Sequence, residues 1–267
     1  MALTTTSFET LAVHEEHGVL RVTFSRPAAL NAFDETMEQE LRGVVADIGR
    51  SDSVRVVVLA GAAGNFMSGA DIRMLQRWAA LAESGDLPDA LEGLFTPSLL
   101  EELPQPVVAA VDGYALGMGL EIALACDFRV LTDRATVGLP EIRLGVMPGA
   151  GGTQRLPRLV GRTRASEMIM ADTRIGAEQA LAWGIASRVV APDELDAEVD
   201  KLVQRLLSLS PFALRRAKAA ILGSETGDLA DGLSAERRLF TELVRSEDAH
   251  EGTQAFLEKR RPSFVGR

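Results

Sequence analysis

Two glutamates stand at positions where a carboxylate could transfer protons. Glu121 interrupts an apolar run, Leu120-Glu121-Ile122-Ala123-Leu124-Ala125-Cys126, where an ionised carboxylate is costly unless it is paired or hydrogen-bonded. Glu141 follows Pro140 and opens an expected short helix. Two carboxylates that share a water molecule can act as general acid and general base. Each could also simply cap a helix N-terminus, and taken singly Glu141 is assigned to capping, whereas Glu121 leaves both roles open.

Three glycine-bearing segments, at residues 66–73, 113–121 and 140–155, each follow an expected strand. Glycine allows close approach to a ligand and a positive φ, although such residues more often simply make turns. None of the segments contains Gly-x-x-x-x-Gly-Lys-Ser/Thr, and 117–119 lacks the third glycine of a dinucleotide fingerprint. Nucleotide hydrolysis and hydride transfer are therefore disfavoured.

The remaining chemically versatile residues predict no metal centre and no reactive thiol. His14, His17 and His250 are too scattered in the sequence to form a metal site. Cys126 is embedded in an apolar run, which favours an inert core thiol over a nucleophile.

The bulk composition predicts a soluble protein with one large domain, or one domain with a small appendage. The chain has 267 residues, of which 46% are hydrophobic and 25% are charged. Its formal charge of −10 argues against a broad contact with nucleic acid or an anionic membrane. With a single cysteine and no apolar run of signal-peptide length among the first twenty residues, a cytoplasmic location is expected.

Strands alternate with loops and helices in the first part of the chain, which predicts an α/β layer structure. Strands are expected at 19–24, 54–60 and 106–111, the second of them rich in β-branched residues. Asp34 is an expected N-cap of a helix whose apolar face is Met37, Leu41, Val44, Val45 and Ile48. Residues 81–106, rich in Pro, Gly and acids, are expected to form a loop-bearing helical excursion.

From about Gly161 onward the pattern predicts only helices. Two amphipathic helices are expected, over 195–207 and 229–244. Their apolar faces could cover their own core or a neighbouring subunit, and the sequence leaves both open.

In order and spacing, the three glycine-bearing segments together resemble those of the crotonase family, the enoyl-CoA hydratases and isomerases. The matching stretches are Gly69-Ala70-Asp71-Ile72-Arg73, residues 113–121, Cys126-Asp127 and residues 140–156. The resemblance extends from Ser25-Arg26-Pro27, with Leu30-Asn31-Ala32, to residues 256–260. Residues 75–102 depart from the pattern, in a neighbourhood that helps to shape the acyl pocket in this family.

The resemblance implies an α/β fold with two parts: a crotonase-like spiral of ββα units over residues 1–195, which holds the acyl-CoA site, and a C-terminal helical trimerisation region over 196–267. It further implies a homo-trimer or a dimer of trimers that binds coenzyme A thioesters in a bent form. No metal or other cofactor is expected, since coenzyme A is part of the substrate, and neither a nucleic acid nor a membrane is an expected partner.

By motif position, the backbone N–H groups of Ala70 and Met118 are expected to polarise the thioester carbonyl. Fixed N–H donors at a helix N-terminus stabilise the negative charge of a developing enolate. The family often has glycine where Met118 stands, and the methionine side chain is expected to narrow the pocket. Glu121 is expected to orient and activate the water, and Glu141 to deliver a proton to Cα.

Because the chain is acidic and coenzyme A is polyanionic, local arginines are needed, and Arg26 and Arg73 are the first candidates, with the basic run 259–261 as a further one. The full set of expected acyl-CoA contacts is Arg26, Ala28, Ala70, Asp71, Ile72, Arg73, Tyr114, Leu116, Gly117, Met118, Pro140 and Gly149.

Retention of both glutamates predicts a hydratase that adds water syn to a trans-2-enoyl-CoA, because family isomerases and decarboxylases often lack one of the pair. An enoyl-CoA isomerase, or another enolate-forming member, is the alternative. The net acidity and the intact glutamates speak against a catalytically idle relative that binds acyl-CoA or RNA.

Overall fold

The structure is a computed structural model that describes residues 8–86 and 97–267. It divides into two compact units. The first takes in the described residues up to 103 together with 107–200, and the second takes in 104–106 and 201–267. Part of the expected 81–106 excursion, residues 87–96, lies outside the described residues.

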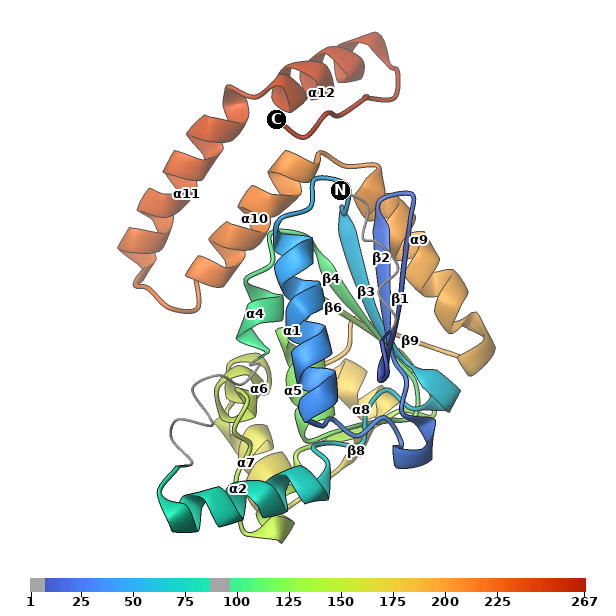
Figure 1. The fold of residues 1–267 in the computed structure, drawn as a ribbon. Helices are drawn as coiled ribbons and strands as arrows, with labels where there is room; N and C mark the ends of the chain where they lie inside the picture. Colours follow the sequence, from blue (N-terminus) through green and yellow to red (C-terminus); the bar gives the residue numbers. More distant parts are fainter. Residues whose placement is uncertain (1–7, 87–96) are drawn as a thin grey trace. The chain divides into compact units, whose positions relative to one another are not determined.

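The first unit is built on a six-stranded sheet in the order β1-β2-β3-β4-β6-β9 (Figure 1). All neighbours are parallel except β1 and β2, which form an antiparallel pair. β4 is apolar and buried at every position, as expected for a parallel strand covered on both faces. The strands are β1 (Leu11–Glu16), β2 (Val19–Phe24), β3 (Val56–Gly61), β4 (Val107–Val111), β6 (Phe128–Thr132) and β9 (Arg188–Val190).

A second, three-stranded sheet has the order β5-β7-β8, with the strands β5 (Tyr114–Leu116), β7 (Thr136–Gly138) and β8 (Ile175–Gly176). Two isolated parallel bridges, Phe33 with Ala70 and Met67 with Ala115, add short pairings beside it. The Met67–Ala115 bridge joins the first and second glycine-bearing segments.

Asp34 caps α1 (Glu35–Gly49) as expected, since its side chain accepts a hydrogen bond from the Met37 N–H at 2.9 Å. The apolar face predicted for this helix is buried. The other helices that the structure describes in the first unit are η1 (Pro27–Ala29), η2 (Ala62–Gly64), α2 (Ile72–Ser84), α4 (Ser98–Glu101), α5 (Met118–Ala125), η3 (Pro140–Leu144), α6 (Gly152–Val160), α7 (Arg162–Met170), α8 (Ala177–Ala182) and η4 (Pro192–Glu194).

The prediction that only helices follow Gly161 is wrong, because β8 and β9 lie beyond it. These strands have two and three residues, too few to show a two-residue period in the sequence. Each exists because it pairs with the edge of an existing sheet: Ile175 lies opposite Val137, and Arg188 opposite Val130. The three strands predicted earlier in the chain, and the α/β layering, are confirmed.

The second unit is helical. α9 (Leu195–Leu207) leads into it, followed by α10 (Pro211–Gly223), α11 (Leu229–Val244) and α12 (Glu247–Glu258), so both expected amphipathic helices are present. Large apolar side chains remain exposed on it, among them Leu229, Phe240, Phe256 and Leu257. Among the residues that the structure describes, no helix has the length and apolar content needed to cross a bilayer.

Gly119 sets how closely α5 approaches the first glycine-bearing segment. A Cβ at this position would lie 2.4 Å from the Met67 carbonyl oxygen, a contact that requires backbone movement. We expect Gly119→Ala to destabilise the protein by about 1–3 kcal/mol, although alanine is the better helix former. Urea unfolding at fixed protein concentration measures the difference.

Gly43 provides the matched control, because it lies in α1 and a Cβ there would meet nothing within 4 Å. Gly43→Ala should be neutral or stabilising by up to about 1 kcal/mol. Equal stability of the two variants would contradict the close approach of α5 to Met67.

Candidate active site

Glu121 lies in the first turn of α5 with an exposed fraction of only 2%. Its Oε1 accepts hydrogen bonds from the backbone N–H groups of Ala150 and Gly152, each at 2.8 Å. The carboxylate is thus held by the third glycine-bearing segment and not by the N-terminus of its own helix. Burial raises the pKa of Glu121, while the two N–H donors and the charge of Arg155 act in the opposite direction.

Glu141 lies in η3, directly after Pro140, and is partly buried. Its Oε2 is buried and has no hydrogen-bond partner among the described residues. Burial raises the pKa of Glu141 to about 7, and the negative charges of Glu121 and Asp172 contribute to the rise. A carboxyl group with a pKa near neutrality can both give and accept a proton at physiological pH.

Gly117 lies close to the Glu141 carboxylate. It precedes α5, and at its φ of 51° a side chain is disfavoured. A Cβ on Gly117 would lie 3.1 Å from Glu141 Oε1, so η3 approaches this turn closely. The Glu121 charge acts on the Glu141 carboxyl, which places the two carboxylates within electrostatic reach of each other.

The hydrogen bonds around Ala70 leave its backbone N–H available to donate to a ligand. The Phe33 N–H donates to the Gly69 carbonyl at 2.8 Å, and the Asp71 N–H donates to the Phe33 carbonyl at 2.8 Å. In this parallel pairing the intervening Ala70 N–H points away from Phe33. Within the described part of the chain it donates no hydrogen bond.

The Met118 amide is available for a different reason. Met118 is the first residue of α5, where a backbone N–H has no acceptor in its own helix. It also donates to no other described residue. A Cβ on Gly117 would lie 3.6 Å from the Gly69 Cα, so the segments that carry the Ala70 and Met118 amides are adjacent.

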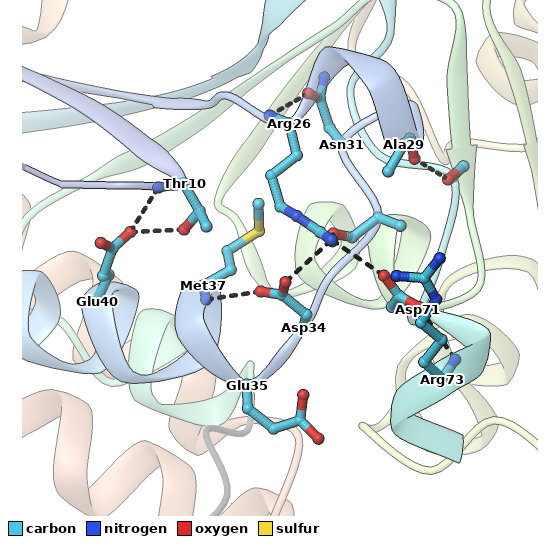
Figure 2. Close-up of polar contacts among 12 residues, drawn as sticks. Thr10, Arg26, Ala29, Asn31, Asp34, Glu35, Met37, Glu40, Asp71 and Arg73 are labelled. Carbon is cyan, nitrogen blue, oxygen red and sulfur yellow. Dashed lines mark hydrogen bonds and ion pairs between the residues drawn. The ribbon is translucent and has the colours of Figure 1, made fainter. Parts of the chain in front are cut away.

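The Arg26 guanidinium forms ion pairs and hydrogen bonds with other residues of the chain (Figure 2). Its Nη2 lies 3.0 Å from Asp34 Oδ2 and 3.0 Å from Asp71 Oδ2, and its Nη1 donates to the Ala32 carbonyl. Asp34 and Asp71 are the N-caps of α1 and α2, so this guanidinium ties two helix starts together. The Arg73 N–H and the Arg26 guanidinium lower the pKa of Asp71.

The other expected contact residues differ in exposure. Leu116 and Gly117 are buried, and Ala70, Asp71, Met118 and Pro140 are partly buried. Ala28, Ile72, Arg73, Tyr114 and Gly149 are exposed. The close approaches of Gly117 to Gly69 and to Glu141, together with the start of α5, bring together Ala70, Gly117, Met118, Glu121 and Glu141.

The sequence did not assign roles to three residues of the third glycine-bearing segment that contact this site. The amides of Ala150 and Gly152 bind Glu121, and Arg155 donates to the Ala150 carbonyl at 3.1 Å. The Gly-Ala-Gly-Gly run at 149–152 was the available signal, because such residues expose backbone amides. Among the described residues, no cluster of His, Cys, Asp or Glu could hold a metal ion.

Known proteins share this architecture along the whole chain. The enoyl-CoA hydratase/isomerase family model matches residues 14–267. The crystal structure of an enoyl-CoA hydratase from Bacillus anthracis superposes with a TM-score of 0.88 at 35% identity, covering 97% of this chain and 100% of that one. The crotonase fold is thereby confirmed.

Curated relatives also match over nearly the whole chain. A 2,3-dehydroadipyl-CoA hydratase from Escherichia coli is 42% identical, covering 96% of this chain and 99% of that protein. A crotonyl-CoA hydratase from Syntrophomonas wolfei is 35% identical, covering 98% and 100%. The chain belongs to the enoyl-CoA hydratase/isomerase family.

The raised pKa of Glu141 has a consequence for stability. The folded protein holds this proton up to a pH of about 7, whereas an unfolded glutamate releases it near its ordinary pKa of 4.5. Between these values the folded state binds more protons, so this group's contribution to stability falls as pH rises. We expect the stability of Glu141→Gln relative to wild type to rise by about 1–3 kcal/mol from about pH 5 to about pH 8.

Urea unfolding midpoints across that range measure the effect, and any constant cost of the buried amide cancels. Glu178→Gln is the matched control, because Glu178 is exposed in the first turn of α8. A Glu141→Gln profile parallel to that of wild type would rule out the raised pKa.

Proposed function

We propose that this protein is an enoyl-CoA hydratase, which adds water syn to a trans-2-enoyl-CoA and yields a 3-hydroxyacyl-CoA. The observation that carries the proposal is a buried and a partly buried carboxylate beside two backbone amides that are available to a ligand. One carboxylate is held by N–H donors and the other has an unpartnered oxygen and a pKa of about 7. Two related proteins are named as hydratases of 2-enoyl thioesters, which supports this substrate class.

In the proposed reaction, the thioester carbonyl oxygen accepts hydrogen bonds from the Ala70 and Met118 amides. Water attack on Cβ pushes electrons onto this oxygen, and the two N–H groups stabilise the resulting enolate. Because these donors belong to the main chain, the methionine at 118 leaves the chemistry intact, and its side chain narrows the pocket.

The proton balance requires both glutamates. Ionised Glu121 takes a proton from the attacking water as the C–O bond forms at Cβ. Protonated Glu141 gives its proton to Cα as the enolate collapses, so that the product gains one hydrogen and one hydroxyl. A proton then passes from Glu121 to Glu141, directly or through water, to restore the starting state.

The proposal also covers coenzyme A binding, the oligomeric state and the location of the protein. Coenzyme A is bound as part of the substrate, with Arg73 as an exposed cation at the end of the first glycine-bearing segment. Oligomerisation through α10 to α12 into trimers or dimers of trimers accords with the exposed apolar residues of these helices. No further organic cofactor or metal is part of the proposed reaction, and the proposed location is the cytoplasm.

Deletion of one amide donor tests the oxyanion hole. We expect Ala70→Pro to lower kcat on crotonyl-CoA by about 10²–10³-fold, because proline has no N–H. The Ala70 amide donates no hydrogen bond to another described residue, so the fold loses no hydrogen bond by this change. Circular dichroism and the melting temperature check folding, and near-normal turnover in a folded variant would remove Ala70 from the mechanism.

Glutamine substitution tests the carboxylate pair. Glutamine keeps size and hydrogen bonding but cannot transfer the proton, so Glu121→Gln and Glu141→Gln should each lose about 10²–10⁴-fold in kcat with a modest change in KM. If the pair acts as a unit, the double variant is little worse than the poorer single one. Turnover of crotonyl-CoA, with product identification, measures all three variants.

Exposed Glu178→Gln again serves as the control and should retain wild-type turnover. Losses that multiply in the double variant would contradict a shared water molecule. An isomerase would behave differently: one glutamine variant would be inactive, the other nearly normal, and the product would carry a shifted double bond.

A further inference from the structure

Arg155 is a partly buried arginine of α6 that is anchored to α4. Its Nε lies 2.9 Å from Glu101 Oε1, and its Nη2 lies 2.8 Å from Glu101 Oε2. The same Nη2 donates to Ser98 Oγ at 3.0 Å. The side chain is only 12% exposed. Paired contacts of this kind fix both the position and the plane of a guanidinium.

The third nitrogen of the same guanidinium reaches the loop before α6. Nη1 donates to the Ala150 carbonyl at 3.1 Å. It passes over Gly151, where a Cβ would lie 1.8 Å from Nη1 and where φ is 107°. Only glycine fits under this side chain, so the observed position of the Arg155 guanidinium requires glycine at residue 151.

The peptide that Arg155 holds lies between the two peptides that hold Glu121. The Ala150 carbonyl belongs to the peptide that joins Ala150 to Gly151, whereas the donors to Glu121 Oε1 are the N–H groups of Ala150 and Gly152. Displacement of this segment would carry both donors away from the carboxylate. By holding the carbonyl between them, Arg155 restrains the backbone that carries both N–H groups.

We propose that Arg155 is a positioning residue for Glu121, and that Ser98 and Glu101 of α4 act on the reaction through it. This inference rests on the proposed hydratase function. α4 belongs to residues 75–102, the part of the chain that departs from the crotonase pattern, so this segment contributes to the site through a polar contact.

The charge of Arg155 also favours the ionised form of Glu121. The Arg155 charge opposes the rise in the pKa of Glu121 that burial causes, as do the two N–H donors. Loss of the guanidinium removes its charge and loosens the donors, so Glu121 holds a proton up to a higher pH. Because the reaction needs ionised Glu121, activity then falls more at acidic pH than at alkaline pH.

The test compares Arg155→Gln and the double variant Arg155→Met/Glu101→Gln with wild type on crotonyl-CoA. The double variant leaves no unpaired carboxylate at position 101, so it guards against misfolding from a buried lone charge. We expect both to lose about 10- to 100-fold in kcat at neutral pH with little change in KM. The acidic limb of kcat/KM should move to higher pH.

Arg158→Gln is the matched control. Arg158 lies in the same helix, is exposed, and donates to the Gln154 carbonyl at 2.8 Å. Its removal should leave kcat and the pH profile unchanged. Hydrogen exchange adds a readout that is independent of turnover: the amides of residues 149–152 should exchange faster in the Arg155 variants and not in Arg158→Gln.

Two kinds of failure are distinguishable. If wild type hydrates crotonyl-CoA and Glu121→Gln is impaired, but folded Arg155 variants match Arg158→Gln in kcat and pH profile, the inference is overturned and the hydratase proposal stands. A loss of stability without a change in kcat or in the acidic limb also overturns it, because Arg155 would then have only a structural role. Absence of hydration by wild type overturns the hydratase proposal and this inference with it.

Discussion

Burial of the Glu121 carboxylate is the constraint on which the rest of the site depends. A carboxylate that is 2% exposed needs hydrogen-bond donors, and its neighbours in α5 are apolar. The donors are Ala150, in the loop before α6, and Gly152, the first residue of that helix. This backbone approaches closely because residue 152 has no side chain: a Cβ there would lie 3.0 Å from Glu121 Oε1. On another side of α5, Gly119 allows contact with Met67, and this contact keeps the first glycine-bearing segment beside the N-terminus of α5.

The two carboxyl groups lie in different surroundings. Burial raises the pKa of both, but Glu121 receives two N–H donors and the nearby charge of Arg155. Glu141 has an unpartnered buried oxygen, and the charges of Glu121 and Asp172 raise its pKa further, to about 7. Two carboxyl groups in different environments can serve as one acid and one base. The different surroundings of Glu121 and Glu141 thus fit the proton roles proposed for them.

The sequence predicted those features that local pattern determines. The Asp34 cap, the buried face of α1 and the buried β4 follow from residue order and periodicity alone. The pattern of glycines and glutamates located Ala70, Met118, Glu121 and Glu141 by resemblance. What the sequence did not reveal depends on tertiary pairing. β9 forms by pairing with β6, and Arg155 forms a hydrogen bond with Glu101, which lies 54 positions away in the chain. The roles of the expected contact residues remain predictions.

Arginines inside an acidic chain fix backbone as well as offering positive charge to a ligand. Arg26 was expected to contact coenzyme A, yet its guanidinium is bonded to Asp34, Asp71 and the Ala32 carbonyl, next to the segment that presents the Ala70 amide. Arg155 does the same for the loop that presents the Ala150 and Gly152 amides. In each case a planar cation with several donors holds a carboxylate and a carbonyl at once, which a lysine would do less well. Burial and oriented amides together set the electrostatics of the site, and these two arginines contact the segments that carry the amides.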